Sequence, residues 1–161
     1  MYAKILVPTD GSDHSLKAAK RALELQKVFG SKIVIYHAEK HYYIPDDPIR
    51  PMGFPFIDFT SIATLTKEAQ YLQMQDQFKQ WGDKMLQKTA EIFKEAGVVV
   101  ETRLIKDVSA EDYAASAVKK EKFDLVVVGC KGHHSSLRKA LLGTVAEKIS
   151  NNVDCDVMIV R

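Results

Sequence analysis

Residues 126–132 read Val126-Val-Val-Gly129-Cys-Lys-Gly132, and after ten further residues come Gly143 and Thr144. Three β-branched residues predict a buried strand that ends at the first glycine. Glycine permits a turn with positive φ and lets backbone N–H groups approach a ligand closely. Gly143 opens a predicted helix, and the first N–H groups of a helix have no partners within it. Together these features predict a binding site for phosphate.

Each part of this pattern also has a purely structural interpretation. Two glycines after a strand are typical of a tight turn, and Thr144 and Glu147 have the spacing of a capping box. The pattern differs from the dinucleotide fingerprint and from the P-loop, so those two kinds of nucleotide site are not supported.

Strand-like and helix-like segments alternate along the chain. Apolar runs typical of buried strands occupy residues 4–8, 33–38, 98–105, 124–128 and 157–160. Helical periodicity covers residues 12–29, 66–96, 109–120 and 144–151, with Gly30 as a stop signal and Ser109 as an N-cap. The alternation predicts an α/β fold: a single doubly wound domain whose five-stranded parallel sheet has helices on both faces.

The order of the strands locates the expected ligand. If the first strand lies between the second and the fourth, the order is 3-2-1-4-5, and ligands bind at the carboxyl ends of the first and fourth strands. The turns that leave these strands are Pro8-Thr9-Asp10-Gly11 and Gly129-Cys-Lys-Gly132. The predicted topology and the glycine pattern therefore indicate the same crevice. Asp10 also has the position to form an Asx-turn with Ser12.

Residues 40–64 form a segment rich in proline and aromatic residues. We interpret it as a loop insertion within one domain that covers residues 1–161, because a second domain would not fit. The sequence leaves open whether the segment is a lid, a partner surface or disordered.

Composition excludes several classes of function. The chain has 46% hydrophobic and 27% charged residues and a net charge of +2, without a basic run, so neither nucleic acid nor an anionic membrane is an expected partner. The absence of a long apolar run argues against a transmembrane helix or a signal peptide, and we expect a cytoplasmic protein.

Cys130 and Cys155 belong to opposite ends of neighbouring strands and are expected to be free thiols.

The chain resembles the universal stress protein (UspA) family, in its ATP-binding branch. The resemblance covers essentially the whole chain and rests on the segment Ile5-Leu-Val-Pro-Thr-Asp10-Gly-Ser12, on the glycine pattern, and on the final strand that starts at Cys155. ATP-binding members of the family have nine residues between the second and third glycines, and this chain has ten. The family also commonly dimerises through the last strand, so the resemblance implies a homodimer through residues 155–161.

The resemblance implies a site for adenine nucleotide. The first turn would contact adenine and ribose, the end of the second strand would pair with the adenine edge, and the glycines with the helix start would hold the phosphates. Apart from the resemblance, Lys131 and Arg138 flank this pattern, and their charges either neutralise phosphate or are solvated loop charges. Magnesium or manganese would be carried by the phosphates and water. The expected nucleotide-binding residues are Pro8, Thr9, Asp10, Ala38, Val128, Gly129, Lys131, Gly132, His133, Gly143, Thr144 and Val145.

These observations predict an ATP-binding protein of the universal stress type that acts as a nucleotide-dependent switch or recruits a partner. ADP or AMP are alternative ligands. No residue is an evident catalyst, so we expect no enzyme, although slow ATP hydrolysis stays open. The alternative is an interaction protein that uses the same fold without a nucleotide. The sequence identifies neither a base beside Cys130 nor a complete metal-ligand set around it, and His37 is interpreted as a structural histidine.

Overall fold

The computed structural model describes residues 1–39, 67–132 and 142–161. It contains five strands and four helices in the described residues. The strands are β1 (Lys4–Pro8), β2 (Lys32–Glu39), β3 (Glu101–Lys106), β4 (Leu125–Gly129) and β5 (Asp156–Val160). The helices are α1 (Asp13–Phe29), α3 (Lys67–Lys94), α4 (Ala110–Glu121) and α5 (Thr144–Asn152). The proline- and aromatic-rich segment 40–64 lies outside the described residues.

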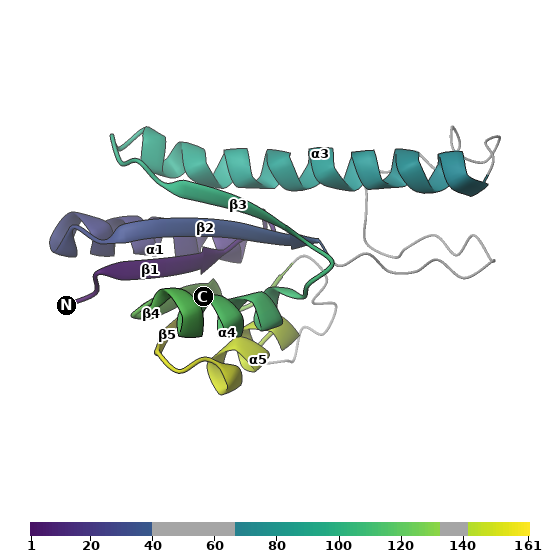
Figure 1. The fold of residues 1–161 in the computed structure, drawn as a ribbon. Coiled ribbons are helices and arrows are strands. Elements are labelled where there is room, and N and C mark those ends of the chain that lie inside the picture. The colour runs from purple at the N-terminus through teal and green to yellow at the C-terminus, as the bar shows by residue number, and fades with distance from the viewer. Residues whose placement is uncertain (40–66, 133–141) are drawn as a thin grey trace.

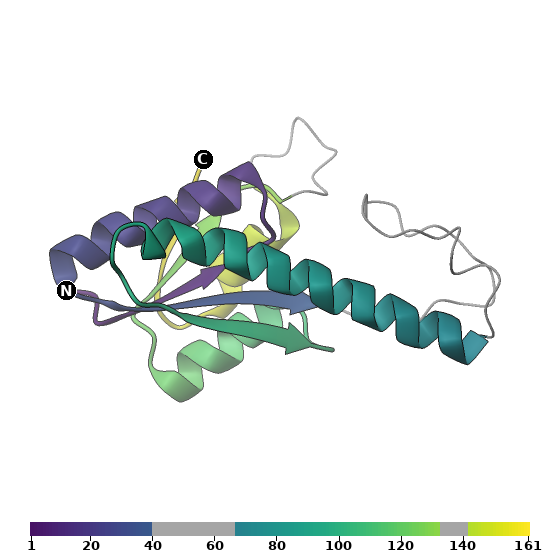
Figure 2. The same ribbon diagram turned by 90° about the horizontal axis from the view of Figure 1, so that it is seen from above.

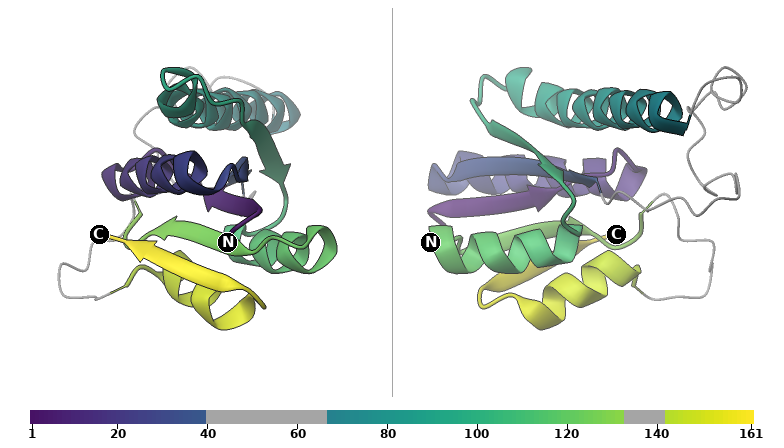
Figure 3. Two further views of the ribbon diagram at one scale, coloured as in Figure 1. Left: turned by 90° about the vertical axis from the view of Figure 1, so that its left-hand side faces the viewer. Right: turned by 45° about the vertical axis from the view of Figure 1, so that its right-hand side comes forward.

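All five strands lie in one parallel sheet with the order β3-β2-β1-β4-β5. The α/β fold and the strand order predicted from the sequence are thus confirmed. Helices α1 and α3 cover one face of the sheet, and α4 and α5 cover the other (Figures 1 and 3). Helix α3 runs along the side of the sheet formed by β2 and β3 (Figure 2).

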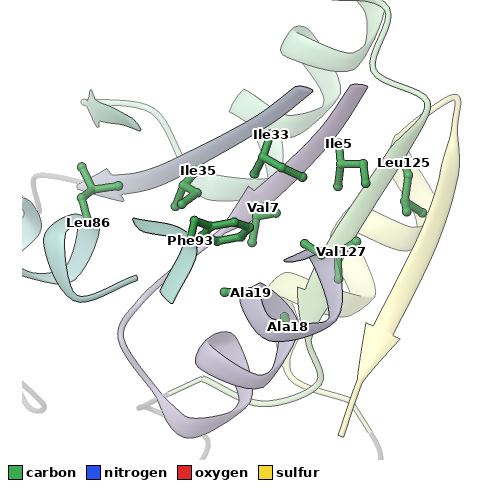
Figure 4. Close-up of a cluster of buried hydrophobic side chains, with 11 residues drawn as sticks. Ile5, Val7, Ala18, Ala19, Ile33, Ile35, Leu86, Phe93, Leu125 and Val127 are labelled. Atoms are coloured by element: carbon green, nitrogen blue, oxygen red, sulfur yellow. The ribbon is translucent and has the colours of Figure 1, made fainter. Parts of the chain in front are cut away.

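The two faces of the sheet have separate hydrophobic cores. Side chains alternate along a strand, so Ile5 and Val7 pack toward α1 and α3, where Phe93 lies beside Val7 (Figure 4). Leu6 packs toward α4 and α5. Full burial of an aliphatic side chain of this kind contributes about 1.5–3 kcal/mol. The central strands β1 and β4 therefore hold the layers together and fix the positions of the turns that follow them.

Local signals set most of the helix ends. Ser12 caps α1 by accepting a hydrogen bond from the Ser15 amide, and Gly30 ends the helix with φ of 68°. Ser109 caps α4 as the sequence predicts, by accepting from the Asp112 amide.

The capping box predicted for α5 is wrong. Gly143 is the N-cap, and no side chain caps this helix. Thr144 is instead the first helical residue, so its hydroxyl is not used as a cap. Glu147 is the fourth helical residue, one position past the third, where a capping box has its acid. The pattern of threonine and glutamate is therefore displaced from the true helix start by one residue.

The third strand begins at Glu101 instead of residue 98. Val99 is 95% exposed and belongs to the connection from α3, although its apolar neighbours suggested a strand.

Gly82, in the middle of α3, has a clear packing role. A Cβ atom there would lie 2.5 Å from Glu39 Oε1 and 2.6 Å from Leu104 Cδ1, so glycine lets α3 approach β2 and β3 closely. No helix in the described residues is long and apolar enough to span a membrane.

Candidate functional site at the switch point

The turn after β1 directs an acidic side chain toward the loop that follows β4. Gly11 has φ of 74°, a conformation that favours glycine. Asp10 Oδ1 accepts a 3.0 Å hydrogen bond from the Ser12 amide, which confirms the Asx-turn. The other carboxylate oxygen, Oδ2, lies 2.7 Å from the place that a Cβ atom on Gly132 would occupy. Asp10 therefore shapes its own turn with one oxygen and faces the loop after β4 with the other.

The glycine loop, residues 129–132, packs tightly against the start of α1. A Cβ atom on Gly129 would lie 2.6 Å from the carbonyl carbon of His14 and 2.8 Å from the Ser15 nitrogen. Positive φ is found among the described glycines only at residues 11, 30 and 97. The expectation that the glycine pattern serves to provide positive φ is therefore wrong. Close approach of backbone to backbone is the reason for glycine here.

Hydrogen bonds connect the glycine loop to three other elements. Cys130 N donates to Val160 O at the end of β5 over 2.7 Å, and Cys130 O accepts from Gly143 N over 2.7 Å. Ser12 Oγ donates to Lys131 O over 3.4 Å. Gly143 also lies so close that a Cβ atom on it would be 3.7 Å from Gly132 N. The loop, the start of α1 and the start of α5 thus meet at one place.

Two helices begin at this place. Helix α1 starts at Asp13 and has 17 residues, and α5 starts at Thr144 and has 9 residues. A helix start offers unpaired N–H groups and a partial positive charge, and both attract anions. Lys131 adds a formal positive charge in the loop. The arrangement suits a phosphorylated ligand whose hydroxyl groups contact the Asp10 carboxylate.

The backbone groups of Ala38 point toward the β1 side of β2, beyond the end of the β1–β2 pairing. Thr9 N donates to Tyr36 O, so Tyr36 directs its polar backbone groups toward β1, whereas Glu39 O accepts from Asp107 N on the β3 side. Because these directions alternate along a strand, the N–H and C=O of Ala38 point toward the β1 side. The pairing of β1 with β2 ends at Pro8 and Tyr36, so it does not reach Ala38.

The other predicted residues are placed as follows. Pro8 ends β1 and is buried, and Val128 packs its side chain into the core under α4 and α5, so only its backbone can meet a ligand. Thr144 and Val145 are exposed in the first turn of α5. His133 lies outside the described residues. The described residues include no group of three or more His, Cys, Asp or Glu side chains able to hold a metal ion.

Several contacts around the site join residues that are distant in sequence and therefore could not be predicted from it. His14 Nδ1 lies 3.4 Å from Cys130 Sγ, so a base does stand beside this thiol. Thr89 on α3 contacts Thr9, and His37 Nδ1 lies 2.7 Å from Thr9 O. Burial lowers the pKa of His37, although its hydrogen bond with Thr9 and the nearby Asp10 charge oppose that shift. No local pattern links these pairs.

Both cysteines are free, as predicted. Cys130 is buried with an exposed fraction of 3%. Burial, with the charge of Asp156, raises the pKa of the Cys155 thiol to about 11, so this thiol is protonated at neutral pH. Cys130 is thus shielded from solvent, and Cys155 does not favour a thiolate.

The model of the universal stress protein family matches residues 1–161. A universal stress protein of Methanocaldococcus jannaschii is 31% identical over 161 residues, which are 100% of this chain and 83% of that protein. The universal stress protein YxiE of Bacillus subtilis is 30% identical over 164 residues, with 100% of both chains covered.

Solved structures agree with the fold. A universal stress protein in complex with cAMP is 26% identical, with a TM-score of 0.62 over 99% of this chain and 97% of that chain. Two structures below 25% identity have the same fold. One is an Archaeoglobus fulgidus universal stress protein in complex with dAMP, at 15% identity and a TM-score of 0.62 over 99% and 98% of the chains. The other is an Arabidopsis thaliana family protein with AMP bound, at 19% identity and a TM-score of 0.63 over 98% and 90%.

Proposed function

This chain belongs to the universal stress protein family, and we propose that it binds ATP at the crevice between β1 and β4 as a nucleotide-dependent switch or partner-recruiting module. The observation that carries the proposal is the closed arrangement of the glycine loop. Gly143 is hydrogen-bonded to Cys130, and Asp10 Oδ2 faces Gly132. A side chain in place of Gly132 would fill the space between loop and carboxylate.

Each part of the nucleotide has a matching group. Backbone N–H groups at Gly132 and at the start of α5 suit the phosphates, and Lys131 supplies positive charge. The hydroxyl of Thr144 is not used in capping and is available on the same helix turn. Asp10 Oδ2 suits a ribose hydroxyl, because a carboxylate is a strong acceptor for O–H donors. The N–H and C=O of Ala38 suit the acceptor and the amino group on the adenine edge. The complexes of relatives with cAMP, dAMP and AMP support an adenine nucleotide as the ligand class.

Magnesium or manganese would enter with the phosphates. Mg²⁺ keeps several water ligands and is bound mainly by phosphate oxygens in sites of this kind. That role needs no dedicated cluster of protein ligands. The metal would reduce repulsion among the phosphates while this chain's N–H groups orient them.

We propose that ATP acts as a retained ligand. Rapid phosphoryl transfer requires a group that positions a water molecule or another nucleophile. Among the described residues near the site, Cys130 and His14 are a nucleophile and a base in contact, but the Cys130 thiol is buried. A fast ATPase activity of the purified protein would contradict this part of the proposal.

We also propose a homodimer through β5. This strand is at the edge of the sheet, and its residues from Val157 to Val160 are only partly buried. An apolar edge strand can pair with a second chain through its outer backbone groups. The two free cysteines suit the cytoplasm as the location of this dimer.

The second candidate is a nucleotide-independent interaction protein, favoured by the ten-residue spacing between Gly132 and Gly143. Competition binding with ATP, ADP, AMP, cAMP and GTP separates the candidates. The proposal expects adenine nucleotides to displace a fluorescent ATP analogue and GTP to displace it much less. Absence of any binding by a folded sample would favour the interaction protein.

A further inference from the structure

We propose that Thr89 and His37 are positioning residues of the nucleotide site: they hold Thr9, and thereby the turn that presents Asp10. This inference rests on the proposed nucleotide-binding function. Thr89 lies on α3, and His37 lies on β2 directly before Ala38; neither side chain is among the groups proposed to touch the nucleotide. Both are buried, so water cannot readily replace their contacts.

The hydrogen-bond directions at Thr89 follow from counting protons. Thr89 Oγ1 donates its proton to Met85 O at 2.9 Å, so in the 2.8 Å contact with Thr9 Oγ1 it must act as the acceptor. Thr9 Oγ1 therefore donates to Thr89 and itself accepts from Gly11 N at 3.3 Å. The alternative acceptor for Thr9, Ser15 Oγ, is 3.4 Å away. A series of hydrogen bonds, each donating in the same direction, thus connects the Gly11 amide through Thr9 and Thr89 to the Met85 carbonyl of α3.

His37 holds the backbone of the same residue. Its Nδ1 lies 2.7 Å from Thr9 O, and a carbonyl oxygen can only accept, so Nδ1 carries the proton. Thr9 N donates to Tyr36 O at 2.9 Å. The amide, carbonyl and hydroxyl of Thr9 are therefore all occupied immediately before Asp10. A rotation of Thr9 would break these bonds, and this is why Asp10 has a defined direction.

Helix α3 makes further contacts with this turn. Lys88 Nζ donates to Gly11 O at 3.4 Å. Met85 lies so close to Gly11 that a Cβ atom there would collide with its sulfur. Gly82, one turn earlier on the same side of α3, lies over Glu39 and next to His37. One face of α3 thus packs closely against the turn after β1. Through these contacts the helix helps to position the turn, although the two segments are distant in sequence.

The first test compares ATP affinity in matched variants. Thr89→Val keeps the shape but removes the acceptor for Thr9, and Thr89→Ser restores it. His37→Asn keeps a donor near the Nδ1 position, whereas His37→Leu removes it. We expect Thr89→Val and His37→Leu to weaken ATP binding about fivefold or more, because each removes a buried hydrogen bond. Thr89→Ser and His37→Asn should recover most of the affinity.

A control separates positioning from general stability. Val118→Ala removes buried methyl groups on the other face of the sheet and should lower the urea midpoint without changing ATP affinity. If Thr89→Val binds ATP as tightly as the unmodified protein, or if Val118→Ala weakens binding equally, the positioning inference is wrong.

A second readout needs no nucleotide. In the ATP-free protein, Thr89→Val should accelerate amide hydrogen exchange at Gly11, measured by NMR, and leave the capped amide of Asp112 unchanged. Unchanged exchange at Gly11 would overturn the inference. If the unmodified protein fails to bind ATP while Thr89→Val accelerates exchange at Gly11, the proposed function is wrong, but the inference that Thr89 positions Thr9 is supported.

Discussion

Gly143 N donates a 2.7 Å hydrogen bond to Cys130 O. This bond joins the N-cap of α5 to the loop after β4, two residues before Gly132, and so brings the two ends of the ten-residue interval between the second and third glycines close together. One residue more than the family pattern therefore does not separate the glycines in space. Gly143 remains in contact with the loop, since a Cβ atom on it would lie 3.2 Å from Cys130 O and 3.7 Å from Gly132 N.

The two glycines of the loop should respond differently to a methyl group. Gly129→Ala would push a Cβ atom against the backbone of α1, so we expect it to lower the free energy of unfolding by about 1–3 kcal/mol. Among the described residues, the Cβ atom of Gly132→Ala would lie nearest the end of the Asp10 side chain and not a backbone atom, so stability should change by less than about 0.5 kcal/mol while ATP affinity falls. Urea unfolding and calorimetric titration of both variants check this contrast. Equal loss of stability in the two variants would contradict it.

Asp10→Asn isolates the charge of the carboxylate. The amide oxygen can still accept from the Ser12 amide, so the turn should persist. We expect ATP affinity to fall about tenfold, because a hydrogen bond to a charged acceptor is stronger than one to a neutral acceptor. Asp112→Asn, at the cap of α4, is the control and should bind as the unmodified protein does. Unchanged affinity of Asp10→Asn would show that Oδ2 makes no contact with the ligand.

His37 should make stability depend on pH. Burial lowers its pKa in the folded state below the ordinary value of about 6.5. The unfolded chain therefore binds a proton first as the pH falls below about 6.5, and the free energy of unfolding decreases until the lowered folded pKa is reached. His37→Asn should flatten this part of the profile, measured as urea midpoints between about pH 7.5 and 5. An identical slope in the variant would mean that His37 does not carry this dependence.

The edge strand gives a test of the proposed dimer. Ile159→Lys places a charge on β5, and we expect light scattering to show a monomer where the unmodified protein is a dimer. A charge on the opposite edge strand, Thr102→Lys on β3, should leave the dimer intact. Circular dichroism must show that both variants are folded. A dimer that survives Ile159→Lys would rule out β5 as the interface.

Local sequence patterns predicted the features that depend on neighbouring residues. Ser109 and Gly30 act at helix ends as expected, and the apolar runs correctly predicted the strands of the parallel sheet. The capping box of α5 failed because threonine followed by glutamate fits the first turn of a helix in more than one register. Contacts such as Thr9 with Thr89, 80 residues apart, leave no local pattern and appear only when α3 is placed on the sheet.

The most direct test of nucleotide binding is the nucleotide content of the purified protein, followed by calorimetric titration of Mg-ATP into a stripped sample. The proposal predicts adenine nucleotide released on denaturation, or a clear heat of binding to one site per chain that Gly132→Ala weakens. A folded, stripped sample that releases no nucleotide and gives no heat of binding, confirmed by equilibrium dialysis, would contradict the proposal.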